Sequence, residues 1–192
     1  MPLTVTTNKE ESVYEKKPQS NYENVVSHID KFPGLRFYQL KKEIGIANGT
    51  LQHHLSSLMK SGIISIEYDN STPRYFSKKI ESNSQVIIKR LSQNTSSQII
   101  RLLLKKECQT FAQLVKYTKK SPGTVSLYKN KLVADKIIVG STDNCKCNKK
   151  HGMKIKYRLS DPKKVRALVL EYGKSSLSKS ADNLADVFLS LK

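Results

Sequence analysis

The chain has 192 residues, a length that suits one large or two small domains, and its formal charge is +18. Residues 81–192 carry 23 basic and 8 acidic residues, whereas residues 1–80 carry 11 and 8. Such an excess indicates a surface that meets phosphate, although a generally lysine-rich surface gives the same charge. No apolar run approaches the roughly 18 residues of a membrane span and no signal sequence opens the chain, so we expect a cytoplasmic, nucleoid-associated protein.

The first part of the chain consists of an arm without an apolar period, followed by stretches that favour helices. Residues 1–20 are polar without an apolar period, which predicts a flexible N-terminal arm. A helix is predicted after them, ended by Pro33-Gly34, and a second over about 36–44, ended by Gly45. A third helix follows a short turn, with Asn48 as its N-cap. The first helix shows apolar residues at helical spacing, namely Tyr22, Val25, Val26 and Ile29.

A hairpin is predicted after the third helix. Residues 63–68 have the composition of a strand, residues 69–73 that of a turn, and residues 74–76 that of a return strand. Helix, turn, helix and hairpin in this order are typical of a helix-turn-helix with a wing. We therefore expect a first winged helix-turn-helix domain over residues 21–81.

The same pattern returns further along the chain. Residues 37–64 align without a gap on residues 111–138, and nine of the 28 positions are identical. This repeat predicts a second winged helix-turn-helix domain over 95–161, joined to the first by a connecting helix over 82–94. The expected fold is mainly α with small β-hairpin wings, an α+β class in which two winged domains stand in tandem.

The end of the chain, residues 162–192, is predicted to form C-terminal helices. Its last stretch has apolar residues at alternating steps of four and three, the spacing of a coiled-coil seam. Two heptads are marginal by themselves, so this helix must pack on its own core or on a second subunit. We favour a homodimer, with a seam formed by Leu177, Ala181, Leu184, Phe188 and Leu191.

The third helix of the first domain is the expected recognition helix. Its exposed side and first turn are predicted to enter the major groove of duplex DNA, where Gln52 can bond adenine and the amides of Gly49 and Thr50 can hold a phosphate. A solvated polar helix face gives the same pattern. The candidate DNA contacts are Asn48, Gly49, Thr50, Gln52, His53, Ser57, Lys60 and, at the wing, Arg74.

The second domain offers a less regular recognition helix. Lys129 stands where the first domain has the apolar Leu55, and Leu127 takes the place of His53. This helix is therefore expected to sit differently or to bind backbone and not bases. Its candidate contacts, with those of its basic wing, are Ser121, Thr124, Ser126, Asn130, Lys131, Lys146, Lys149 and Lys150.

The second wing also contains a partial metal-ligand set, Cys145 and Cys147 with His151. The cysteines are closer than in most structural zinc sites, and only Cys108 is left as a further thiol. Lysine neighbours also lower a thiol pKa, which favours a redox switch as an alternative. A cationic wing that contains cysteines explains the pattern best, so we expect no metal and no cofactor.

The segment PGLRFYQLKKEIGIANGTLQHHLSSLMKSGIISIEYDNSTPRYF resembles the winged helix-turn-helix of archaeal transcription regulators. The resemblance covers about residues 22–80, and it extends to 95–160 only through the repeat. In that family the part corresponding to GIANGTLQHHLSSLMKSGII holds the turn, the recognition helix and the entry to the wing. The resemblance thus implies DNA contact by Asn48, Gly49, Thr50, Gln52 and His53.

The sequence favours a DNA-binding transcription regulator whose partner is double-stranded DNA. Two alternatives stay open: a replication or chromatin protein that binds DNA without base preference, and a protein-interaction module of the transcription machinery. No phosphate loop, paired carboxylates or activated nucleophile is evident in the sequence, so we do not expect an enzyme.

Overall fold

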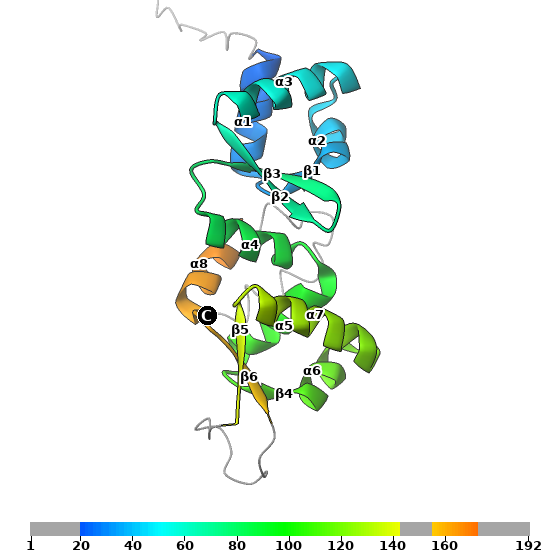
Figure 1. The fold of residues 1–192 in the computed structure, drawn as a ribbon, viewed down its shortest axis with the longest axis vertical. Helices are drawn as coiled ribbons and strands as arrows, with labels where there is room; N and C mark the ends of the chain where they lie inside the picture. Colours follow the sequence, from blue (N-terminus) through cyan, green and yellow to red (C-terminus); the bar gives the residue numbers. More distant parts are fainter. Residues whose placement is uncertain (1–19, 143–154, 173–192) are drawn as a thin grey trace, which may run out of the picture.

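A computed structural model describes residues 20–142 and 155–172 of the chain. Two compact units are stacked along the long axis, and helix α4 lies between them (Figure 1). The first unit holds α1 (Asn21–Lys31), β1 (Leu35–Arg36), α2 (Phe37–Ile44), α3 (Asn48–Lys60), β2 (Ile64–Asp69) and β3 (Thr72–Ser77). Its three strands form an antiparallel sheet in the order β1-β3-β2.

The second unit follows α4 (Ser82–Leu91) and repeats this order of elements. It holds α5 (Asn94–Lys105), β4 (Gln109–Thr110), α6 (Phe111–Thr118), α7 (Pro122–Ala134), β5 (Ile138–Ser141) and β6 (Lys156–Leu159). Its sheet is again antiparallel, in the order β4-β6-β5, and α8 (Pro162–Tyr172) comes after it. The fold is mixed α and β, with small sheets at the side of the helices.

The two units also share unusual backbone conformations at positions 74 residues apart. Gly45 ends α2 with φ 75°, and Lys119 ends α6 with φ 53°. Gly62 and Lys136, after α3 and α7, have φ values of 71° and 57°. A left-handed conformation costs a lysine about 1–2 kcal/mol but costs a glycine almost nothing. The second unit therefore keeps these turns without the residue that forms them most easily.

Hydrogen bonds at the helix starts differ between the units. Ser20 and Glu23 form a reciprocal capping box at α1. Ser121 caps α7, with its hydroxyl accepting from the Thr124 amide at 3.3 Å. The expected cap of α3 was wrong, because Ala47 is the N-cap and Asn48 is the first helical residue. The amides of the first turn of α3 thus receive no side-chain cap from that position.

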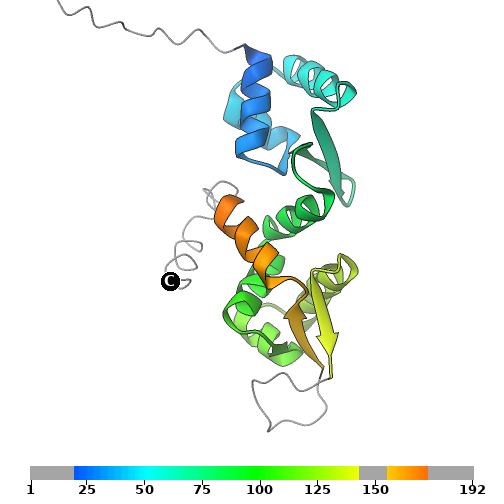
Figure 2. The same cartoon turned by 90° about the vertical axis from the view of Figure 1, so that its left-hand side faces the viewer.

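Helix α4 is more than a connector between the units. Ile87, Ile88 and Leu91 are buried in one apolar cluster with Phe76 of β3 and with the core of the second unit. The core of the first unit is a separate cluster around Val25, Leu40 and the buried face of α3. Helix α8 lies beside α4 (Figure 2), where Lys164 pairs with Glu81 at 2.8 Å. Within the described residues, no helix is long and apolar enough to cross a membrane.

Candidate nucleic-acid interface

Helix α3 is held in the first unit by one apolar face. Leu51, Leu55 and Leu58 are buried in the core, and the turn between α2 and α3 begins at the left-handed Gly45. His54 is half-buried, and its ring lies edge-on to that of Tyr22 with 6.0 Å between centroids. His54 is therefore a packing residue at the edge of the core and not a partner of His53 in a metal site.

The opposite face of α3 is polar and open to solvent. Most of the predicted contacts of this helix lie there, and Thr50 alone is half-buried. Side chains of this kind donate to and accept from base edges in the major groove. Since Ala47 supplies no cap, the amides at the start of the helix are also suited to bind an anion. The exposed candidates are Asn48, Gly49, Gln52, His53, Ser57 and Lys60.

The corresponding face of α7 has a different chemistry. Leu127 is 53% exposed at the position that His53 occupies in α3. Ser121 and Thr124 bond one another, with 2.8 Å between their hydroxyl oxygens, so two predicted DNA contacts serve the helix start. Asn130 is exposed, but Ser126 is half-buried. This surface offers fewer groups for base readout than α3 does.

Two lysines of α7 pack on aromatic rings. Lys129, at the position of the buried Leu55, is half-buried with its Nζ 5.2 Å from the centre of the Tyr157 ring. Lys131 lies likewise over Tyr128, at 5.5 Å. A cation over a ring face is attracted to it, and the aliphatic stem covers apolar surface. The ring explains how a lysine is accommodated at an otherwise apolar position of the repeat.

A lysine cluster between α6 and α7 of the second unit was not among the predicted contacts. Lys116, Lys119 and Lys120 are all exposed at the end of α6 and in the turn before α7. The run KYTKKS is the sequence signal that would have found them. Because the cluster directly precedes a helix N-terminus, its position suits contact with backbone phosphate.

Arg74 was expected to project from the wing toward DNA, and the structure places it elsewhere. Its side chain is only 6% exposed and binds inward, with Nη1 donating to the Gly34 carbonyl at 2.8 Å and Nη2 to Asp69 at 3.1 Å. The turn of the β2-β3 hairpin, Asn70-Ser71, stands next to this pair. Arg74 therefore stabilises the hairpin and does not project from it toward DNA.

The end of this hairpin is bound to the region between the units. Asp69 accepts hydrogen bonds from Arg36 at 3.2 Å and from Gln93 at 2.7 Å, in addition to that from Arg74. On the same strand, Glu67 pairs with Lys89 of α4 at 2.9 Å. Burial acts to raise the pKa of Asp69, but the hydrogen bonds from Gln93 and Arg74 outweigh it and keep this pKa below its ordinary value. Asp69 is thus an ionised anchor of the hairpin.

Several predicted residues lie outside the described part of the chain. They are the basic wing residues Lys146, Lys149 and Lys150, the partial metal set Cys145, Cys147 and His151, and the seam residues Leu177, Ala181, Leu184, Phe188 and Leu191. Cys108, within the described ranges 20–142 and 155–172, is buried and disulfide-bonded. Within these ranges, no three metal-ligating side chains form a group.

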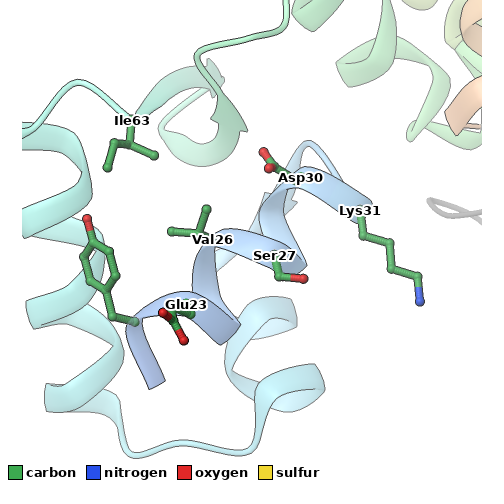
Figure 3. A pocket seen from close by; sticks show the side chains of 7 residues that line it. Glu23, Val26, Ser27, Asp30, Lys31 and Ile63 are labelled. Carbon is green, nitrogen blue, oxygen red and sulfur yellow. The ribbon is translucent and has the colours of Figure 1, made fainter. Parts of the chain in front are cut away.

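A shallow hollow of about 640 Å³ lies beside α1 (Figure 3). Val26 and Ile63 form part of its wall, and its charged lining residues are Glu23, Asp30 and Lys31. Asp30 pairs with Lys79 at 2.9 Å, so one of these carboxylates is already neutralised. A hollow with more acidic than basic lining does not attract phosphate. The candidate interface is therefore the α3 side of this unit and not the hollow beside α1.

Comparison with known proteins identifies the first unit. Residues 19–88 match a family model described as an N-terminal HTH domain, where HTH denotes helix-turn-helix. The search of curated proteins gave no match. The matched region contains α1 to β3 and most of α4, including the exposed face of α3. The chain thus carries an HTH domain, and such a domain indicates DNA as the partner.

Proposed function

We propose that the chain is a transcription regulator that binds duplex DNA through two winged helix-turn-helix units in tandem. The exposed face of α3 is the observation that carries the proposal, because it presents polar side chains on the third helix of the HTH domain, the expected recognition helix. Gln52 and His53 are the side chains that read bases. A glutamine bonds adenine in bidentate fashion, which contributes about 1–3 kcal/mol of discrimination.

The second unit contributes mainly affinity. Lys116, Lys119 and Lys120 contact phosphates, and Leu127 replaces a polar side chain on the face that would meet bases. Phosphate contacts position a protein on DNA without reading its sequence. A homodimer formed through residues 162–192 would place two such chains on a two-fold related site.

The proposal is tested by fluorescence anisotropy of the full chain on duplexes that contain a selected binding site. We expect Gln52→Ala with His53→Ala to weaken binding to the selected duplex by about tenfold or more, and binding to an unrelated duplex much less. Asn83→Ala is the control, because Asn83 is an exposed polar residue of α4 away from the interface. Equal affinity of the double variant and the control on both duplexes contradicts base readout by α3.

A second candidate is a DNA-binding protein of chromatin or replication with little base preference. The surface at the start of α7 favours this candidate, because its exposed lysines stand beside the apolar Leu127 and not beside polar side chains that could read bases. In that case Lys119→Gln with Lys120→Gln lowers affinity equally on every duplex, and the α3 variants have no effect. The same titrations therefore separate the two candidates.

A further inference from the structure

A polar cavity of about 630 Å³ lies where the two units meet. One wall comes from the start of α2 and the end of the β2-β3 hairpin, and the other from the start of α5 and one side of α7. A volume of this size admits a small organic ligand. The cavity is separate from the exposed face of α3, because none of its lining residues belongs to that helix.

The lining of the cavity is rich in positive charge. Arg36, Arg74 and Lys131 stand against a single carboxylate, that of Asp69. Asp69 is already bound by Arg36, Arg74 and Gln93, so it leaves little negative charge for the cavity. The Arg36 side chain is 45% exposed and can reach a ligand while it keeps its bond to Asp69.

Arg74 shows that the positive charge is not fully compensated. Its side chain is 94% buried, and its buried Nε has no hydrogen-bond partner. Burial lowers the pKa of this guanidinium; the hydrogen bond to Asp69 opposes the change, and the charges of Arg36 and Arg90 add to it. An anion in the cavity would offset the repulsion among these cations.

The start of α5 adds donors to the same wall. Asn94 and Thr95 line the cavity, and the N-cap residue Gln93 makes no side-chain cap to the helix. Its amide Nε2 donates instead to Asp69 at 2.7 Å. The first amides of a twelve-residue helix carry partial positive charge and point out of its end, a geometry that suits phosphate.

We infer that this inter-unit cavity binds a phosphate group, held by Arg36 and Lys131 at the N-terminus of α5. The inference goes beyond the proposed function and does not depend on it. The phosphate belongs either to a small organic ligand that fills the cavity or to the backbone of bound DNA. A ligand here would contact both units and would stabilise their relative arrangement.

The test uses pyrophosphate as the probe and isothermal titration calorimetry of the full chain at about 0.15 M salt, an ionic strength that screens exposed charges. We expect saturable binding that Arg36→Gln with Lys131→Gln weakens by tenfold or more. Lys42→Gln with Lys78→Gln removes the same charge from exposed positions outside the cavity and should change the dissociation constant less than twofold. Thermal unfolding of both variants confirms that they fold.

Competition with duplex DNA identifies the source of the phosphate. If the phosphate is that of DNA, pyrophosphate displaces a duplex and the cavity variant binds duplex more weakly than the control variant. If it belongs to a small ligand, duplex affinity is the same with and without pyrophosphate. The absence of saturable pyrophosphate binding, or equal binding by the two variants, overturns the inference, whatever the affinity for DNA.

Discussion

The first and second units have the same order of elements but different surfaces. Both place a helix after a left-handed turn, against a three-stranded antiparallel sheet. The first presents polar side chains on α3, whereas the second presents Leu127 on α7 and lysines in the turn before it. The repeated backbone is thus compatible with two tasks, base readout in one unit and phosphate binding in the other.

The hairpins add to this comparison. The end of the first hairpin is tied through Asp69 to α4 and α5 and is not free to project toward DNA. Arg90 of α4 lies within 4.0 Å of Asp69 and also bonds Asp135 after α7, so one cluster joins both units. The first hairpin is therefore a contact between units, and this role distinguishes it from a wing that binds the minor groove.

The largest expected effect is that of breaking this contact. Asp69→Asn leaves the surrounding arginines without their shared carboxylate and should lower the free energy of unfolding by about 3–5 kcal/mol, because uncompensated buried charge is costly. Urea unfolding measures the change. Glu107→Gln, an exposed carboxylate lost in the second unit, is the control and should cost less than about 0.5 kcal/mol.

The loss of stability in Asp69→Asn should depend on pH. The pKa of Asp69 is lower in the folded chain than the ordinary value near 3.9, so the folded state binds fewer protons than the unfolded state. The contribution of Asp69 is complete above about pH 5 and is lost as the pH falls through the folded pKa. The difference between wild type and Asp69→Asn should therefore shrink below about pH 4. A difference that stays constant down to pH 2 contradicts the role of the ionised carboxylate.

Equivalent core positions should respond equally in the two units. Leu58 and Leu132 are identical in the repeat and both are fully buried. Replacement of either by alanine should cost about 3 kcal/mol, the usual range for a buried leucine being about 2–5 kcal/mol. Chemical denaturation tests each variant. If Leu132→Ala left the free energy of unfolding unchanged, the core of the second unit would not depend on this position as that of the first unit does.

Substitution of two lysines in the turn between α6 and α7 should affect DNA binding but not stability. Lys119→Gln with Lys120→Gln removes two phosphate contacts and should flatten the dependence of log K on log salt by about 2, at 0.9 for each contact. Anisotropy titrations over a salt series give this slope. The matched variant Lys163→Gln with Arg166→Gln alters two exposed cations of α8 and should leave the slope nearly unchanged. Equal changes for both variants would indicate diffuse attraction.

The smallest expected effect concerns the left-handed lysines. Lys119→Gly should stabilise the second unit by about 0.5 kcal/mol, because relief of the left-handed strain exceeds the added freedom of the unfolded chain. Lys120→Gly, one residue later and without a positive φ, should not stabilise. Thermal unfolding compares the two. Stabilisation by Lys120→Gly alone would contradict the assigned backbone strain.

Helical periodicity predicted most of the helices, strand composition predicted the first hairpin, and the repeat predicted the second. The apolar face of α1 lies as expected, with Val25 and Ile29 buried. The strands β1 and β4 were missed because two residues carry no alternation. The predicted turn was also too long, because the hairpin pairs Asp69 with Thr72 and leaves only two residues between them.

The contact between the units could not be predicted from local patterns. Asp69 was assigned to a turn, which its composition favours, and the residues that bind it come from 33 positions before to 24 positions after it. The role of Arg74 could not be predicted from local patterns either. An arginine in a hairpin suggests DNA contact, and only the structure shows that this arginine is buried. Periodicity describes which face of an element is apolar, but not which other element covers it.

The most direct test of the account is selection of binding sites by the wild-type chain from a random duplex pool at physiological salt, repeated with Gln52→Ala and His53→Ala combined and with Leu127→Ala. We predict that the wild type and Leu127→Ala recover the same base motif and that the α3 variant loses it. Recovery of that motif by the α3 variant, or retention of duplexes without any motif by the wild type, would contradict base readout by the first unit.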